Sequence, residues 1–84
     1  MPYVVPSVRI LLAKGLREPQ TPGELNYVFS GIAISYLKSK KLNYQTLNDI
    51  SGAFTEALNE FRRRVIVPYE LEKIAENGDL PWPT

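Results

Sequence analysis

The stretch that decides the fold runs from residue 46 to residue 76 and reads TLNDISGAFTEALNEFRRRVIVPYELEKIAE. Its apolar residues recur three or four positions apart, which is the spacing that places side chains on one face of an α-helix. They are Leu47, Ile50, Phe54, Ala57, Leu58, Phe61 and Val65. One unbroken helix over residues 46–76 would measure about 46 Å, more than the diameter expected of so small a globule.

Pro68 interrupts this pattern. It has no amide hydrogen to donate, and in a regular helix its ring clashes with the carbonyl of Arg64. We therefore predict that the long helix stops or kinks near residues 66–67, with Pro68 as an early residue of a further short helix. Asn77 and Gly78 are typical of a C-cap that ends this last helix.

The sequence Thr21-Pro22-Gly23-Glu24 marks the start of another helix. Threonine caps it, proline occupies the first helical position, and Glu24 reaches back as in a capping box. The apolar stripe that follows is wide enough to need two neighbours, and it comprises Leu25, Val28, Phe29, Ile32, Ala33, Tyr36 and Leu37. The lysines of residues 38–41 complement the dipole at the carboxyl end of this helix.

The remaining elements are shorter. We predict an extended arm over residues 1–6 and a helix over residues 8–17, which Ser7 caps and whose last turn Gly15 weakens. Either Asn43 or Thr46 caps the long helix. Residues 79–84 form a Pro/Trp tail that cannot be helical, and we expect its Trp82 to pack onto the domain or a partner.

Composition narrows the class of protein. Eighty-four residues, 44% hydrophobic and 23% charged, fit one globular domain over residues 1–84 and exclude a wholly disordered, collagenous or disulfide-scaffold chain. A core this small is marginal, so we expect a homodimer. The absence of Cys and His removes disulfides, thiolate zinc sites, cysteine nucleophiles and the usual general base, and we expect no cofactor and no metal.

Charge and hydropathy give little on partners. The net charge of +1 is too small for the broad footprint of a non-specific nucleic-acid binder. The apolar runs are far shorter than the roughly 20 residues of a membrane span. The first six residues lack the basic segment followed by an apolar core that forms a secretory signal. We therefore expect no membrane partner and a cytoplasmic location.

The triplet Arg62-Arg63-Arg64 suggests contact with a phosphate or a nucleic acid. Successive helical residues point about 100° apart, however, so the triplet cannot form one flat patch. Glu60 and Arg64 have the favourable i, i+4 order of a surface pair. Arg62 alone borders the apolar stripe, and we predict that it anchors the structure through an ion pair with Glu70 or Glu72 beyond the kink.

Carboxylates raise the hypothesis of an all-helical, magnesium-dependent nucleotide hydrolase. Such enzymes cluster Glu and Asp on two facing helices and present an E-x-x-E pair. Here Glu56 and Glu60 are four apart, Glu70 and Glu72 diverge by about 200° on a helix, and Asp49 stands alone. The motif is absent, so we do not predict an enzyme.

Two glycines lie inside the strongest helical patterns. Gly31 and Gly52 each cost about 1 kcal/mol relative to alanine, which a close approach of another backbone would offset. Gly52, between Ser51 and Ala53, is thus a candidate crossing point for a helix of the same chain or of a second subunit. Tyr69 is a further candidate for the core or an interface.

Several motifs resemble those of a known family. They are residues 23–28, residues 44–52 with Asn48-Asp49-Ile50, and above all Glu60-Phe61-Arg62-Arg63, Pro68-Tyr69-Glu70, Lys73-Ile74 and Glu76-Asn77-Gly78-Asp79. Over residues 23–80 the chain resembles a family of short uncharacterised proteins from tailed bacteriophages and environmental viral sequences. The resemblance implies a viral accessory protein in the host-cell cytoplasm and carries over no catalytic residue.

The prediction is an all-α fold, a small bundle of three to four helices whose long third helix is kinked at Pro68. We expect a non-catalytic module that binds itself and an unknown protein partner. Its candidate interface or ion-pair residues are Arg62, Glu70, Glu72, Gly52, Tyr69 and Trp82. The alternatives are a nucleic-acid-binding protein that uses residues 62–64 and 38–41 and, more remotely, the magnesium-dependent hydrolase.

Overall fold

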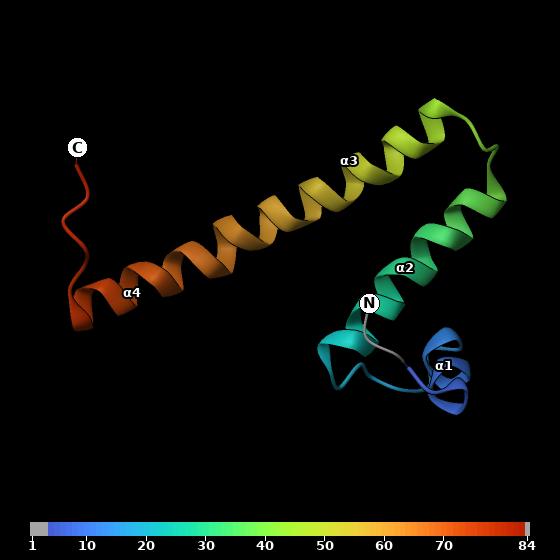
Figure 1. Ribbon diagram of the computed structural model, residues 1–84, viewed down its shortest axis with the longest axis horizontal. Helices are drawn as coiled ribbons and strands as arrows, with labels where there is room; N and C mark the ends of the chain where they lie inside the picture. The colour runs from blue at the N-terminus through green and yellow to red at the C-terminus, as the bar shows by residue number, and fades with distance from the viewer. Residues whose placement is uncertain (1–3, 84) are drawn as a thin grey trace. The chain divides into compact units, whose positions relative to one another are not determined.

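The computed structural model describes residues 4–83, and all regular structure in that range is helical (Figure 1). The elements are α1 (Pro6–Ala13), α2 (Pro22–Ser39), α3 (Tyr44–Phe61), a π-helical turn η1 (Arg62–Ile66) and α4 (Val67–Asn77). The all-α prediction is confirmed, and so is the long third helix, which continues through η1 and α4 without leaving helical structure.

The chain divides into two compact units, Met1–Ile50 and Ser51–Thr84. The first contains α1, α2 and the first turns of α3; the second contains the rest of α3, η1 and α4. Helix packing in the first unit is between α1 and α2. That residues 1–84 act as one domain stays a prediction.

Helix α1 begins two residues earlier than we predicted. Pro6 is its first residue, where a missing amide hydrogen costs nothing because that group has no partner inside the helix. The Val5 carbonyl accepts hydrogen bonds from the amides of Val8 and Arg9, each at 3.0 Å. Ser7 is therefore inside the helix rather than its cap, and no side chain caps this end.

Helix α1 also ends earlier, at Ala13 instead of residue 17, because Gly15 terminates it. Gly15 has φ +70°, a left-handed conformation that a residue with a Cβ rarely adopts. Its amide donates to the Leu12 carbonyl at 3.1 Å, and the Leu16 amide donates to the Leu11 carbonyl at 2.9 Å. This pair of bonds is the Schellman motif, so Gly15 is the stop signal and not a weak interior position.

Helix α2 starts as predicted. Pro22 is its first residue, and the Thr21 hydroxyl oxygen accepts a hydrogen bond from the Glu24 amide at 3.1 Å. The buried apolar side chains of the described residues are Val4, which precedes α1, and Leu12 of α1. Val4 belongs to the predicted arm; residues 1–3 of that arm lie outside the described residues.

Asn43, and not Thr46, caps α3. Its side-chain oxygen accepts a hydrogen bond from the Thr46 amide at 2.9 Å, and its carbonyl accepts from the Leu47 amide at 3.1 Å. Thr46 is buried within the first turn of the helix.

The interruption that we predicted near residues 66–67 takes the form of a π-helical turn. The Val67 amide donates to the carbonyl of Arg62, five residues back instead of four. A π turn is wider than an α turn and holds one extra residue. This relieves the clash between the Pro68 ring and the Arg64 carbonyl, and it leaves Pro68 in the first turn of α4, where no donor is needed.

Helix α4 ends at the predicted signal. Gly78 has φ +85°, and its amide donates to the Ile74 carbonyl at 2.8 Å. Residues 79–83 have no regular structure, in agreement with the predicted tail, and Thr84 lies outside the described residues.

Candidate interaction surface

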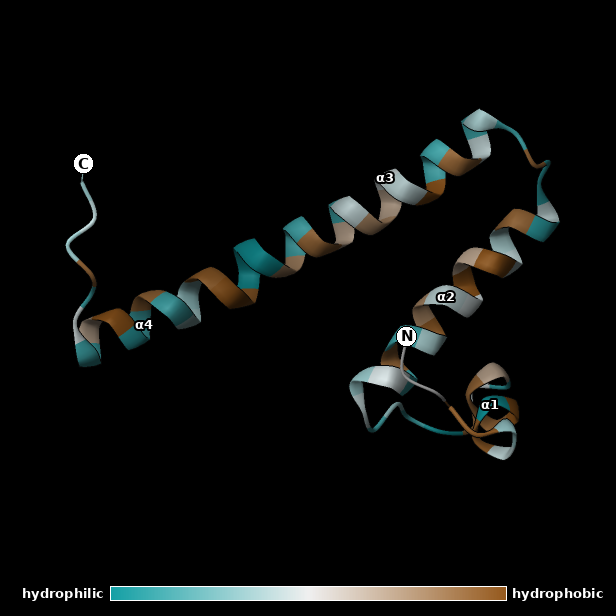
Figure 2. Cartoon of the chain, in the orientation of Figure 1, coloured by the Kyte–Doolittle hydropathy of each residue, from teal (hydrophilic) through white to brown (hydrophobic). Residues whose placement is uncertain are grey.

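An apolar stripe follows α3 into η1 within the second unit. Phe54, Leu58, Phe61 and Val65 are between 45% and 54% exposed. In Figure 2, apolar and polar bands alternate along α3 and α4, as expected of amphipathic helices. We call these four residues the α3 stripe.

No residue of the second unit is buried in the range that the structure describes, 51–83. The apolar side chains of α4 are exposed as well, with Leu71 at 60% and Ile74 at 38%. Within that unit, therefore, no packing partner covers the α3 stripe. Contiguous apolar surface of this kind typically marks a site of protein interaction.

The arginine triplet is held mainly by a single carboxylate. Glu60 accepts hydrogen bonds from both Arg63 and Arg64, so the predicted surface pair of Glu60 with Arg64 is confirmed. Arg62 is exposed, and within residues 4–83 its charge is in no ion pair with Glu70 or Glu72. The anchoring role of Arg62 stays a prediction.

The other predicted interface residues are spread along α4 and the tail. Tyr69 lies under the Lys73 ammonium group, which is 5.5 Å from the ring centre and also 3.2 Å from a Glu76 carboxylate oxygen. Glu70 is in the first turn of α4, where a negative charge complements the helix dipole. Trp82, in the tail, is 69% exposed.

Gly52 lies in open space. Outside its own helix backbone and its chain neighbours, no described atom lies within 4 Å of the position that a Cβ would take, and the same holds for Gly31. The structure therefore shows no close approach of the chain's own backbone at either glycine. A crossing by a second subunit at Gly52 stays a prediction.

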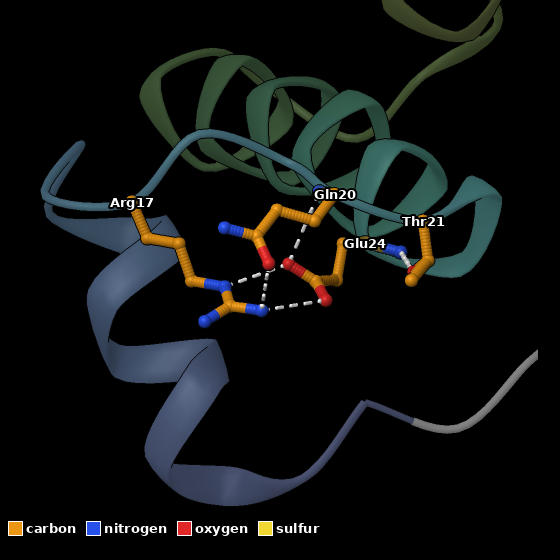
Figure 3. Close-up of polar contacts among 4 residues, drawn as sticks. All are labelled: Arg17, Gln20, Thr21 and Glu24. Atoms are coloured by element: carbon orange, nitrogen blue, oxygen red, sulfur yellow. Dashed lines mark hydrogen bonds and ion pairs between the residues drawn. The ribbon is translucent and has the colours of Figure 1, made fainter.

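The most organised polar cluster, which the sequence spacing does not predict, joins the connection after α1 to the start of α2 (Figure 3). The Arg17 guanidinium contacts both oxygens of Glu24, with Nε at 2.8 Å from Oε1 and Nη2 at 3.0 Å from Oε2. Gln20 adds two hydrogen bonds. Its side-chain oxygen accepts from Arg17 at 3.2 Å, and its backbone amide donates to Oε1 of Glu24 at 3.4 Å. Two parallel bonds to one carboxylate make a strong and directional pair.

Charge and burial in this cluster act in opposite directions on Glu24. The hydrogen bond from Arg17 lowers the pKa of the Glu24 carboxyl below its ordinary value, burial opposes this shift, and the Gln20 amide adds to it. The same hydrogen bond raises the pKa of Arg17. Both groups are therefore charged at neutral pH, and their ion pair links the connection after α1 to α2.

A shallow groove of about 380 Å³ lies between α1 and α2. Its walls are mainly apolar and comprise Leu12, Ala13, Tyr27, Val28, Gly31, Ile32 and Ser35. It contains no titratable group other than the Tyr27 phenol, and so offers apolar contact rather than chemistry.

The two alternative functions, a magnesium-dependent hydrolase and a nucleic-acid-binding protein, find little support in the described residues. Across residues 4–83, no three His, Cys, Asp or Glu side chains gather closely enough to hold a metal ion. Of the lysines at the end of α2, Lys40 lies over the Tyr36 ring at 5.6 Å. None of the helices in the described range has the length and apolarity that a membrane crossing requires.

Comparison with known proteins places the chain in a family. A family model described as a domain of unknown function (DUF6899) matches residues 1–80. The N-terminal arm, which the resemblance in residues 23–80 left out, is thus part of the matched region. No curated protein and no solved structure matches the chain.

Proposed function

We propose that this chain, which belongs to the DUF6899 family of domains of unknown function, is a non-catalytic helical interaction module that works as a homodimer. The observation that carries the proposal is the α3 stripe. Its four large apolar side chains are about half exposed, and none of residues 51–83, the described part of the second unit, is buried. The driving force for covering them is the removal of apolar surface from water, at about 25 cal/mol per Å².

The polar residues around the stripe support a surface for protein contact over one for nucleic acid. Two of the three arginines already share the Glu60 carboxylate, which lowers the positive charge left for phosphates. A nucleic-acid-binding face instead collects unpaired cations on one side. A metal-dependent enzymatic role has less support, because no group of three His, Cys, Asp or Glu side chains that could hold a metal ion appears in residues 4–83.

The proposal extends to the origin of the protein and the place where it acts. The motifs of residues 60–79 resemble those of short proteins from tailed bacteriophages, which supports a viral accessory protein that acts in the host-cell cytoplasm. In that setting, the dimer presents a second surface to a protein partner.

Sedimentation equilibrium tests the proposal with a matched pair of variants. We expect the natural chain to have a dimer mass at tens of micromolar. Phe61→Glu should give a monomer, because it places a charge in the α3 stripe, whereas Asn59→Glu should stay dimeric, because residue 59 points away from the stripe.

Two outcomes would overturn the proposal. One is a monomer mass for the natural chain up to several hundred micromolar; the other is equal dissociation of both variants. A salt-dependent gel shift with DNA or RNA that Arg63→Ala abolishes would favour the nucleic-acid alternative.

A further inference from the structure

The apolar spacing along α3 reads the same in both directions. Phe54 and Phe61 flank the adjacent pair Ala57 and Leu58 at equal distances, three residues on either side. One turn further out, Ile50 and Val65 continue the symmetry with two β-branched side chains. The centre of this palindrome lies between residues 57 and 58.

We infer that two copies of the chain pack α3 against α3 in antiparallel orientation, with the twofold axis between residues 57 and 58. The inference rests on the proposed function and names the geometry of that homodimer. A twofold interface is self-complementary, so each position must meet a position of matching character. With this axis, Phe54 of one copy meets Phe61 of the other.

Charge distinguishes this arrangement from a parallel one. A parallel dimer in register would place the two triplets of residues 62–64 at the same height, and Glu60 neutralises only part of each. In the antiparallel dimer the triplets are about 16 Å apart along the axis, which exceeds the screening length of about 8 Å at physiological salt. Like-charge repulsion therefore disfavours only the parallel form.

One flank of the stripe also matches in size. Ser51 and Arg62 are eleven residues apart, which is close to three full turns, and Arg62 is the first residue after α3. The small residue and the arginine thus share a flank. In the antiparallel dimer, Arg62 passes over Ser51 of the other copy, so a long side chain meets a short one. Gly52 points away from this contact.

Spin labels measure the orientation directly, because the chain has no cysteine of its own. Asn59→Cys and Glu70→Cys each carry one nitroxide, and distances are measured by pulsed electron resonance. A label one residue farther from the twofold axis is about 1.5 Å farther along each helix, so its two copies are about 3 Å farther apart along the helix direction. The resulting offset is about 5 Å for residue 59 and about 37 Å for residue 70. The Glu70 labels should therefore be farther apart by roughly 30 Å.

The outcomes separate the orientation from the proposed function. Equal distances at both positions in a dimer overturn the antiparallel geometry and leave the homodimer intact, whereas a monomer mass overturns both. If the Glu70→Cys variant fails to assemble, Glu72→Cys gives the same comparison, with an axial offset of about 43 Å.

A pair of charge variants at Ser51 gives an independent readout. Ser51→Glu adds a carboxylate opposite Arg62 of the other copy, and Ser51→Lys adds a cation at the same place. Two exposed ion pairs, one at each end of the contact, should tighten the Ser51→Glu dimer roughly three- to tenfold, and the Ser51→Lys dimer should weaken to a similar degree. Equal dimer affinities for the two variants would contradict the antiparallel contact.

Discussion

The substitution of glycine by alanine should have opposite effects at residues 15 and 31, because the two backbones differ. Gly15 has φ +70°, and Gly31 lies in the interior of α2. Apart from chain neighbours and, at Gly31, the backbone of its own helix, no described atom lies within 4 Å of an added Cβ at either position, so contact with other parts of the chain contributes to neither effect. The conformation of the backbone alone decides the sign.

The magnitudes follow from that difference. An L-residue in the left-handed region costs about 1–2 kcal/mol, and the loss of freedom in the unfolded chain returns about 0.4–1 kcal/mol. Gly15→Ala should therefore lower the free energy of unfolding by about 1 kcal/mol. Gly31→Ala should raise it by about 1 kcal/mol, because alanine is the better helix former.

Thermal unfolding followed by circular dichroism measures both changes. Both glycines belong to the first unit. The protein concentration is kept constant, because the proposed self-association would also shift the midpoint. A change of 1 kcal/mol corresponds to about 4–8 °C in a domain of this size, so the two variants should melt about 10 °C apart on opposite sides of the natural chain.

Two results would refute this reasoning. An unchanged midpoint for Gly15→Ala would mean that the chain does not use the left-handed stop that ends α1. A lowered midpoint for Gly31→Ala would mean that another surface covers the groove between α1 and α2 and needs the space that Gly31 leaves open.

Two further predictions concern charged groups. The Arg17 hydrogen bond holds the pKa of Glu24 below its ordinary value of 4.5, so the stability from this pair is complete above that value and is lost as the pH falls through the lowered pKa. The urea midpoint of the natural chain should therefore fall more from about pH 5 to pH 3 than that of Glu24→Gln. The control is Glu18→Gln, which changes an exposed carboxylate, and parallel profiles for the natural chain and Glu24→Gln would contradict the role of the pair. Arg62→Ala should weaken the proposed dimer more than Arg63→Ala or Arg64→Ala in sedimentation equilibrium, because Arg62 borders the α3 stripe; equal losses of affinity would show that the triplet acts only through its total charge. The two exposed pairs of Arg63 and Arg64 with Glu60 should each contribute less than about 1 kcal/mol to the free energy of unfolding.

Local chemistry made parts of the fold predictable. The start of α2 follows from Thr21 and Pro22, and the end of α4 follows from Gly78, because a cap depends on residues within one turn of it. The same reasoning left Asn43 and Thr46 as equal candidates for the cap of α3. Only the structure shows that the side chain of Asn43 accepts the Thr46 amide.

The end of α1 differs from the prediction, although its signal is present in the sequence. Gly15 follows an apolar helical run, and apolar Leu16 comes directly after it, which is the usual composition of a Schellman motif. The prediction places Gly15 inside the helix because the apolar stripe can be extended to Leu16. The backbone bonds from Gly15 and Leu16 show that the stop signal outweighs one more apolar position.

The cluster of Arg17 and Glu24 could not be derived from spacing. A capping box assigns the Glu24 carboxylate to the start of its own helix, and in the structure that carboxylate accepts the Gln20 amide and the Arg17 guanidinium. The approach of Arg17 depends on the path of residues 14–21, which no periodic pattern encodes. The one feature of the sequence that hints at this ion pair is the spacing of Arg17 and Glu24, which are seven residues apart across a short connection.

The π turn determines which apolar residues can share one surface. Leu71 follows Phe61 by ten residues, which in a regular α-helix would place it about 80° from Phe61, at the edge of the same face. One extra residue in η1 removes about 100° of rotation and places Leu71 roughly opposite Phe61. The α3 stripe therefore ends at η1, and the apolar residues of α4 form a separate face. The wider turn before Pro68 gives one long helix two apolar surfaces, so the proposed homodimer through the first would leave the second open to another protein.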